Sequence, residues 1–253
     1  MDNKENVLRL ESWLPEFFSE YQKYRQNWTN SPHKNELSWI KSQELEAWFL
    51  AMEQPLVEAR KGAFGCDPWE IAGVDRDEVR NSAVLAWLLN PKGSHGLGDS
   101  ALSALLARLN LEFRDDFPKT PGNYCFVRTE ENPDGDITNR VDIEIDSENV
   151  YLLIEVKINA VEGVKQLERY GRLAESASGR RPWALLFLTT DGRKSNSAAE
   201  YAAEVFNLSW RDLSRMLMTA VVPILCQKSS TKAPSRIMSE QIVRCFINKI
   251  RSF

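Results

Sequence analysis

Histidine, cysteine and long apolar runs are scarce in this chain of 253 residues. It has two histidines and four cysteines, and the cysteines lie far apart without a C-x-x-C pair. The sequence therefore favours neither a structural zinc site nor a disulfide framework, and we expect a reducing, cytoplasmic location. No apolar run approaches the ~20 residues that cross a bilayer. The polar, mixed-charge N-terminus does not resemble a secretory signal, so we expect no membrane association.

The net charge of −4 argues against a protein that coats nucleic acid, but the charge is unevenly distributed. From residue 209 onward the chain has eight basic and two acidic side chains. Two interpretations are open: a phosphate-binding face beside an acidic metal site, or the solvated surface of helices. On the first interpretation, Arg236, Arg244 and Lys249 are candidate contacts to nucleic acid.

The hydrophobic periodicity changes from helical to strand-like about midway along the chain. Helices are expected at residues ~6–61 (with a break at 29–32), ~75–89, ~98–110, ~162–176, ~210–226 and ~236–251. Strands are expected at residues 125–130, 140–145, 150–158, 182–190 and ~204–208. This order predicts an α/β fold in which a mixed sheet lies between helices. We expect a helical N-terminal extension over residues 1–68 and a core over residues 69–253.

Two charged residues interrupt the apolar strand expected at residues 150–158. Glu155 and Lys157 are two residues apart, so both side chains leave the same face of the sheet. A two-residue turn at 148–149 would place Asp142 opposite Glu155, with Cβ atoms ~5 Å apart. Two carboxylates at that distance repel each other, and a divalent cation between them removes the conflict. A surface salt-bridge cluster is the alternative.

These side chains suit the hydrolysis of a phosphodiester. Asp142 and Glu155 would hold Mg²⁺ or Mn²⁺, with the Val156 carbonyl as a third ligand. A bound cation polarises a phosphoryl oxygen and lowers the pKa of a bound water. Lys157 would orient that water or stabilise negative charge in the transition state.

A pair of polar residues follows on the helix expected after this strand. Gln166 and Tyr170 are four residues apart, so both lie on one helix face and can reach a phosphate, a base or a metal-bound water. Ordinary surface residues of an amphipathic helix are the alternative.

Three residues in loops are further candidate contacts to nucleic acid. Arg193 and Lys194 follow the turn that ends the strand at 182–190, at the end where open α/β sheets bind ligands. His95, in the loop NPKGSHGLG, could contact phosphate or aid proton transfer. A histidine that only hydrogen-bonds its own loop is the alternative.

At the charged strand residues the sequence resembles the PD-(D/E)XK nuclease superfamily. The pattern is Asp142 followed by Glu155-Val156-Lys157, with Val141 in place of the family's leading proline. The spacing of Gln166 and Tyr170 is similar to the Q-x-x-x-Y signature of its exonuclease-like branch.

Two longer segments resemble motifs of a widespread bacterial group in this superfamily. They are EVRNSAVLAWLLNPKGSHGLGD at residues 78–99 and LFLTTDGRK at residues 186–194. In the first segment, Asn81 stands where the group has a histidine. The resemblance implies a restriction-endonuclease-like α/β/α core and a metal site to which Glu78 contributes. It also implies an active nuclease, with DNA favoured over RNA, that takes part in bacterial defence against foreign DNA.

Two other functions remain open. The chain could be a catalytically silent nuclease fold that binds nucleic acid or a partner protein without cutting. It could also be a scaffold whose Trp- and Phe-rich N-terminal helices dock a partner protein or a second copy, as in a homodimer. The intact Asp142, Glu155 and Lys157 favour the enzyme.

Overall fold

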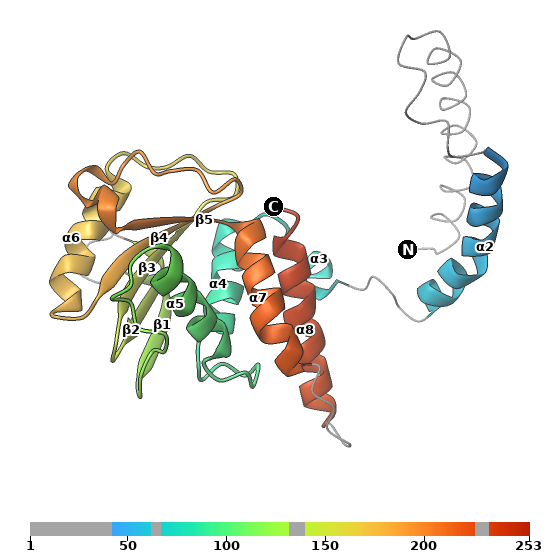
Figure 1. The fold of residues 1–253 in the computed structure, drawn as a ribbon, viewed down its shortest axis with the longest axis horizontal. Coiled ribbons are helices and arrows are strands. Elements are labelled where there is room, and N and C mark those ends of the chain that lie inside the picture. Colours follow the sequence, from blue (N-terminus) through green and yellow to red (C-terminus); the bar gives the residue numbers. More distant parts are fainter. Residues whose placement is uncertain (1–41, 62–66, 132–139, 226–232) are drawn as a thin grey trace, which may run out of the picture. The chain divides into compact units, whose positions relative to one another are not determined.

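The structure is a computed structural model that describes residues 42–61, 67–131, 140–225 and 233–253 (Figure 1). The chain divides into two compact units, residues 1–66 and 67–253. In the first unit, helix α2 (Ser42–Lys61) confirms the helical periodicity of that segment. Residues 1–41, on which the preceding helix was predicted, lie outside the described residues. None of the described helices is long and apolar enough to cross a membrane.

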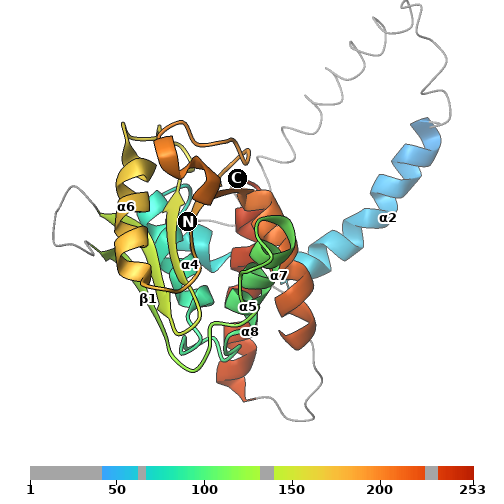
Figure 2. The same cartoon turned by 60° about the vertical axis from the view of Figure 1, so that its left-hand side comes forward.

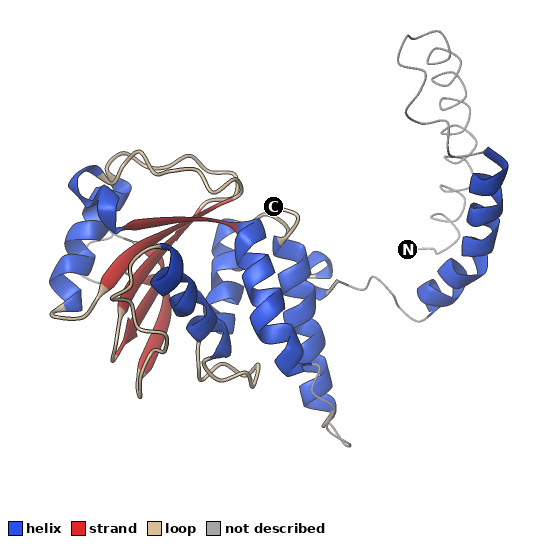
Figure 3. Ribbon diagram, viewed as in Figure 1, coloured by secondary structure: helices blue, strands red, loops and turns tan. Residues whose placement is uncertain are grey.

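The second unit is built around one sheet, whose strands are red in Figure 3. It has five strands in the order β1-β2-β3-β4-β5. The strands are β1 (Cys125–Glu131), β2 (Val141–Ser147), β3 (Tyr151–Val156), β4 (Trp183–Thr189) and β5 (Val205–Ser209). β2 is antiparallel to both β1 and β3, whereas β3, β4 and β5 are parallel. The predicted mixed sheet is confirmed, and each strand overlaps its expected range.

Helices cover both faces of this sheet (Figures 1 and 2). On one face lie α4 (Glu78–Leu89), α5 (Ser100–Glu112) and α7 (Trp210–Leu225), and on the other lies α6 (Gln166–Ser178). The helix α8 (Pro234–Ile250) packs against α7 and the short α3 (Pro68–Ile71), and the 3₁₀ helix η2 (Ala199–Glu204) lies beside α6. The predicted α/β/α arrangement is therefore confirmed.

Strand β3 is buried along its whole length, as its nearly continuous apolar sequence predicts. Leu152, Ile154 and Val156 join the larger core, which includes α4, α5 and α7. Tyr151 and Leu153 join the smaller core under α6. A charged side chain on such a strand is costly unless it is paired, because it loses its hydration.

The turn between β2 and β3 sets the register of the two strands. A backbone hydrogen bond of 3.1 Å closes the predicted two-residue turn at residues 148–149. Ile143 pairs with Ile154, so the next position places Asp142 opposite Glu155. The predicted register is confirmed.

Candidate active site

Two opposed carboxyl groups lie where β2 begins and β3 ends. Asp142 Oδ2 accepts a hydrogen bond of 2.8 Å from the N–H of Val156. Glu155 is 2% exposed. Burial, together with the negative charge of Asp142, raises the pKa of Glu155 to about 8. Burial also raises the pKa of Asp142. The pair therefore retains a proton at neutral pH as long as no cation compensates its charge.

The ammonium group of Lys157 forms an ion pair with Glu155 Oε1. The two side chains are only 11% and 1% exposed, so this is not the surface salt-bridge cluster considered as an alternative. Burial alone would lower the pKa of Lys157, but the charges of Glu155, Asp142 and Glu78 raise it. Lys157 is therefore positively charged at neutral pH.

Gln166 and Tyr170 approach this group from α6. Gln166 Nε2 donates a hydrogen bond of 2.7 Å to Glu155 Oε1 and one of 3.0 Å to the Tyr170 hydroxyl. The Gln166 carbonyl in turn accepts a bond of 3.0 Å from the N–H of Gly163. Tyr170, which is 1% exposed, donates its hydroxyl proton to the carbonyl of Arg140. Both residues thus orient one oxygen of Glu155.

The other oxygen of Glu155 receives no hydrogen bond from an N–H or O–H group. Within the described ranges, no such group donates to Glu155 Oε2, and a hydrogen bond between the carboxyl groups of Glu155 and Asp142 requires the proton that the pair retains. Once ionised, a buried oxygen without a donor costs about 1–3 kcal/mol. A divalent cation bound by Asp142 and Glu155 would satisfy that oxygen, and Mg²⁺ and Mn²⁺ prefer oxygen ligands. The residues present therefore fit such a cation.

Glu78, at the start of α4, holds the loop that follows β3. Its Oε1 accepts hydrogen bonds of 2.7, 2.9 and 2.9 Å from the backbone N–H groups of Ile158, Asn159 and Ala160. Burial alone would raise the pKa of Glu78, but these bonds and the charge of Lys157 lower it. Across the described segments, no group of three or more His, Cys, Asp and Glu side chains is arranged to hold a metal ion. Direct binding of a metal by Glu78 stays a prediction.

Arg193 and Lys194 lie at the same end of the sheet as the two carboxyl groups. Both are exposed in the turn after β4. The neighbouring strands end together there, since the N–H of Lys157 donates a bond of 2.8 Å to the Leu188 carbonyl. Arg193 Nη1 lies 3.5 Å from Asp191 Oδ1, and the Arg193 side chain is 43% exposed.

His95 and Arg236 lie together beyond the other end of α4. His95 is fully buried, and both its ring nitrogens are hydrogen-bonded within its own loop. Arg236 Nη1 donates a bond of 2.6 Å to the Gly96 carbonyl. The twelve residues of α4, ~18 Å at 1.5 Å per residue, separate this loop from Glu78. The structure thus places His95 without access to a phosphate, as the loop-bonded alternative describes.

Arg244 and Lys249 lie farther along α8. Arg244 is partly buried and has an interaction partner in the structure. Lys249, in the last turn of α8, approaches the ring of Phe253. Thirteen residues of α8, ~20 Å at 1.5 Å per residue, separate Lys249 from Arg236. The basic candidates therefore do not all lie beside His95.

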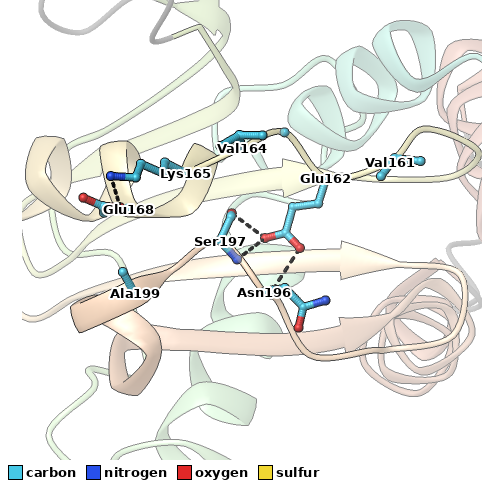
Figure 4. A pocket seen from close by; sticks show the side chains of 9 residues that line it. Val161, Glu162, Val164, Lys165, Glu168, Asn196, Ser197 and Ala199 are labelled. Carbon is cyan, nitrogen blue, oxygen red and sulfur yellow. Dashed lines mark hydrogen bonds and ion pairs between the residues drawn. The ribbon is translucent and has the colours of Figure 1, made fainter.

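A groove of about 480 Å³ opens beside the N-terminus of α6 (Figure 4). Residues 161–165 and 196–199 contribute most of its lining, which includes neither carboxyl group of the opposed pair. Glu162 joins its two sides by accepting hydrogen bonds from the backbone and hydroxyl groups of residues 195–197, two of them at 3.0 Å. This contact connects the loop after β3 with the loop after β4. Sequence reasoning missed it, because contacts between loops have no periodic signal.

The model of a protein family, the PD-(D/E)XK nuclease superfamily, matches residues 66–237. These residues include the opposed carboxyl groups, the lysine that pairs with them, and the glutamine and tyrosine on α6. No curated protein and no solved structure matches the chain. The mixed sheet between helices is consistent with a restriction-endonuclease-like fold. Because the match spans well over half of the sequence and the core of the fold, the chain belongs to the PD-(D/E)XK nuclease superfamily.

Proposed function

We propose that this chain is a Mg²⁺-dependent nuclease that hydrolyses phosphodiester bonds of DNA at Asp142, Glu155 and Lys157, with Mn²⁺ able to replace Mg²⁺. The main support for this proposal is the difference between the partners of the two carboxyl oxygens of Glu155. One of its oxygens is bonded to Gln166 and Lys157, while the other is buried without a hydrogen-bond donor among the described residues. A buried carboxylate oxygen without a hydrogen-bond donor, beside a second carboxyl group, supports a site for a divalent cation.

Each side chain of the site has a separate task. Asp142 and Glu155 would hold the cation together with the Val156 carbonyl, and Glu78 is a further candidate ligand. The cation, when bound, supplies a Lewis acid and a bound water of lowered pKa. Lys157 keeps its positive charge and stabilises the negative charge that develops on the phosphoryl oxygens.

The polar residues of α6 support this chemistry indirectly. Gln166 fixes the orientation of Glu155, and Tyr170 accepts a hydrogen bond from the same amide group. Partners of this kind orient metal ligands and raise the affinity of a site. The buried position of β3 also keeps water away, which strengthens electrostatic interactions among these groups.

The substrate, the biological role and the cellular location are proposed from other observations. Arg193 and Lys194 are exposed at the site's end of the sheet and suit contacts to a nucleic-acid backbone. DNA as substrate, a bacterial defence role and a cytoplasmic location rest on the resemblance of residues 78–99 and 186–194 and on the sparse cysteines. On α2, Trp48 and Phe49 are 54% and 45% exposed, which supports a docking surface for a partner or a second copy.

The test is a cleavage assay with the full chain. Linear, circular and single-stranded DNA and RNA are incubated with Mg²⁺, Mn²⁺ or EDTA. We expect DNA to be cut with either metal and to stay intact in EDTA, and circular DNA distinguishes endonucleolytic from exonucleolytic cutting. Asp142→Asn should bind DNA without cutting it.

A matched control is Asp146→Asn. Asp146 lies on the same strand and face but pairs with Arg181, outside the site, so this variant should cut normally. Cutting in EDTA, or normal cutting by Asp142→Asn, would reject the proposed site. Binding without cutting in every metal would assign the chain to the non-cutting alternative.

A further inference from the structure

Two basic side chains converge on one aromatic ring near the loop that follows β3. The guanidinium carbon of Arg76 lies 5.4 Å from the centroid of the Phe253 ring, and Lys249 Nζ lies 5.6 Å from it. Trp210 packs edge-on against the same ring, with centroids 5.4 Å apart, which holds Phe253 in place. Arg76 precedes α4 and Lys249 is in the last turn of α8, so the fold joins distant segments here.

Neither cation is neutralised by an acidic side chain in the part of the chain that the structure describes. Arg76 Nε donates a hydrogen bond of 3.2 Å to Asn159 Oδ1, and its two terminal nitrogens have no partner among the described residues. Lys249 forms no ion pair there either. Most other arginines of this unit pair with a carboxylate. Each cation lies within 5.6 Å of the ring centroid, so the two are at most about 11 Å apart. Two unpaired like charges at this spacing attract anionic groups, such as the successive phosphates of a nucleic-acid backbone.

The position of Arg76 is tied to the proposed active site. Asn159, which accepts its hydrogen bond, also donates its backbone N–H to Glu78 Oε1. Asn159 is two residues beyond Lys157, a span of at most ~7 Å along the chain. An anion held by Arg76 would therefore lie beside the site rather than in it.

We propose that Arg76 and Lys249 form a phosphate-binding subsite that holds the nucleic-acid backbone next to the phosphodiester that is cut; this rests on the proposed nuclease function. The Arg76 guanidinium is held by the hydrogen bond from Nε to Asn159 and by the Phe253 ring. Its two terminal nitrogens remain available, and such a pair can bind a phosphate through two parallel hydrogen bonds. Lys249 adds a point charge from the other segment. This assigns part of the basic C-terminal segment to substrate binding, whereas Arg236 serves to hold the loop at residue 96.

The experiment measures binding apart from cutting. Arg76→Gln, Lys249→Gln and the control Arg180→Gln each remove one positive charge. Arg180 is exposed, has no charged partner among the described residues, and follows α6, whose length of ~20 Å separates it from Gln166. Fluorescence anisotropy of a labelled single-stranded and a labelled duplex oligonucleotide is recorded in EDTA at several salt concentrations.

We expect each subsite variant to weaken binding about tenfold, the scale of one charge-assisted hydrogen bond. The slope of log K against log salt concentration should also flatten by about 0.7–0.9 for each phosphate that the variant no longer binds. Arg180→Gln should keep the wild-type affinity and slope. Because these measurements need no metal, they hold whether or not the cleavage assay supports the nuclease function.

Three results would overturn the subsite. The first is that both variants bind like Arg180→Gln. The second is that only Arg76→Gln weakens binding and that its melting temperature falls, which would make Arg76 a residue that merely holds Asn159. Lys249 has no bond to that loop, so Lys249→Gln tests phosphate binding independently of Asn159. The third is wild-type binding of dAMP that both variants lose while oligonucleotide affinity stays unchanged, since that would assign the position to a free nucleotide.

Discussion

Gln166 Nε2 donates a hydrogen bond of 2.7 Å to Glu155 Oε1 and thereby links helix α6 to a carboxyl group on a fully buried strand. The same nitrogen lies 3.0 Å from the Tyr170 hydroxyl, and the Gln166 carbonyl is bonded to the N–H of Gly163. All polar atoms of the amide are therefore engaged. Gln166 has a fixed orientation, and through it one oxygen of Glu155 is fixed as well.

Removal of this amide should weaken the site without unfolding the protein. We expect Gln166→Ala to lower Mn²⁺ affinity or single-turnover cleavage by ~10- to 100-fold, the range for loss of a side chain that orients a metal ligand. Tyr170→Phe should lower Mn²⁺ affinity or cleavage by a smaller factor, because Gln166 can still bond to Glu155. Calorimetric Mn²⁺ titration and cleavage rates on both variants test this. Equal losses for the two variants would contradict the primary role given to Gln166.

Lys157 provides the clearest separation of catalysis from stability. Lys157→Ala removes the charge that we propose stabilises the transition state, so we expect cleavage to fall by ~10²-fold or more. DNA affinity should be retained, because the phosphate contacts that we propose lie elsewhere. The matched control is Lys119→Ala, an exposed lysine between α5 and β1, which should cut at the wild-type rate. Cleavage, DNA affinity and melting temperature are measured on the same preparations.

Either of two results would change the assignment of Lys157. Normal cleavage by Lys157→Ala would remove this residue from the chemistry. A melting temperature far below that of the wild type would instead show that the buried ion pair with Glu155 has a structural role.

Glu78 can be tested for its two possible roles with two substitutions. A glutamine carbonyl can still accept the three backbone bonds that Glu78 Oε1 accepts, whereas alanine cannot. If Glu78 is a ligand, as predicted from the sequence, we expect Glu78→Gln to lower metal affinity while the fold stays intact, because the amide removes the charge and keeps the backbone bonds. Glu78→Ala should lower the free energy of unfolding by about 2 kcal/mol, the scale of a lost hydrogen bond to a charged group. If Glu78→Gln loses as much metal affinity as Asp142→Asn, Glu78 is a ligand.

The strands and their register could be predicted because they depend on local rules. Side chains alternate across a sheet, so Glu155 and Lys157 had to share a face. A two-residue turn then determined which residue of β2 lies opposite Glu155. A charged residue in an apolar strand can also be recognised in the sequence as a candidate site residue, since it needs a partner or a metal there.

The contacts between loops and helix ends could not be predicted in this way. Glu78 bonds to residues 158–160, and Arg76 bonds to Asn159, through backbone geometry that leaves no periodic pattern in the sequence. Charge counting likewise could not separate Arg236 from Lys249. Arg236 is bonded to the Gly96 carbonyl, whereas Lys249 has no ion pair among the described residues. Only their places along α8, relative to the rest of the fold, distinguish them.

Proton release on metal binding provides a test of the opposed carboxyl groups. Burial and the charge of Asp142 raise the pKa of Glu155 to about 8. Below that pH the metal-free pair retains a proton, and a cation that binds between the carboxylates must displace it. Affinity for Mn²⁺ should therefore rise with pH, by up to about tenfold per unit, and level off above pH 8.

Calorimetric titration with Mn²⁺ in two buffers of different ionisation enthalpy counts the protons released. We expect about one proton per cation at pH 6 and close to none at pH 9, because Glu155 is already ionised there. Glu155→Gln should abolish both the binding and the proton release. Glu162→Gln is the control: Glu162 has a lowered pKa, since hydrogen bonds from residues 195–197 outweigh its burial, so it is ionised across this range. Affinity that is independent of pH, with no proton released, would mean that the cation does not bind between Asp142 and Glu155.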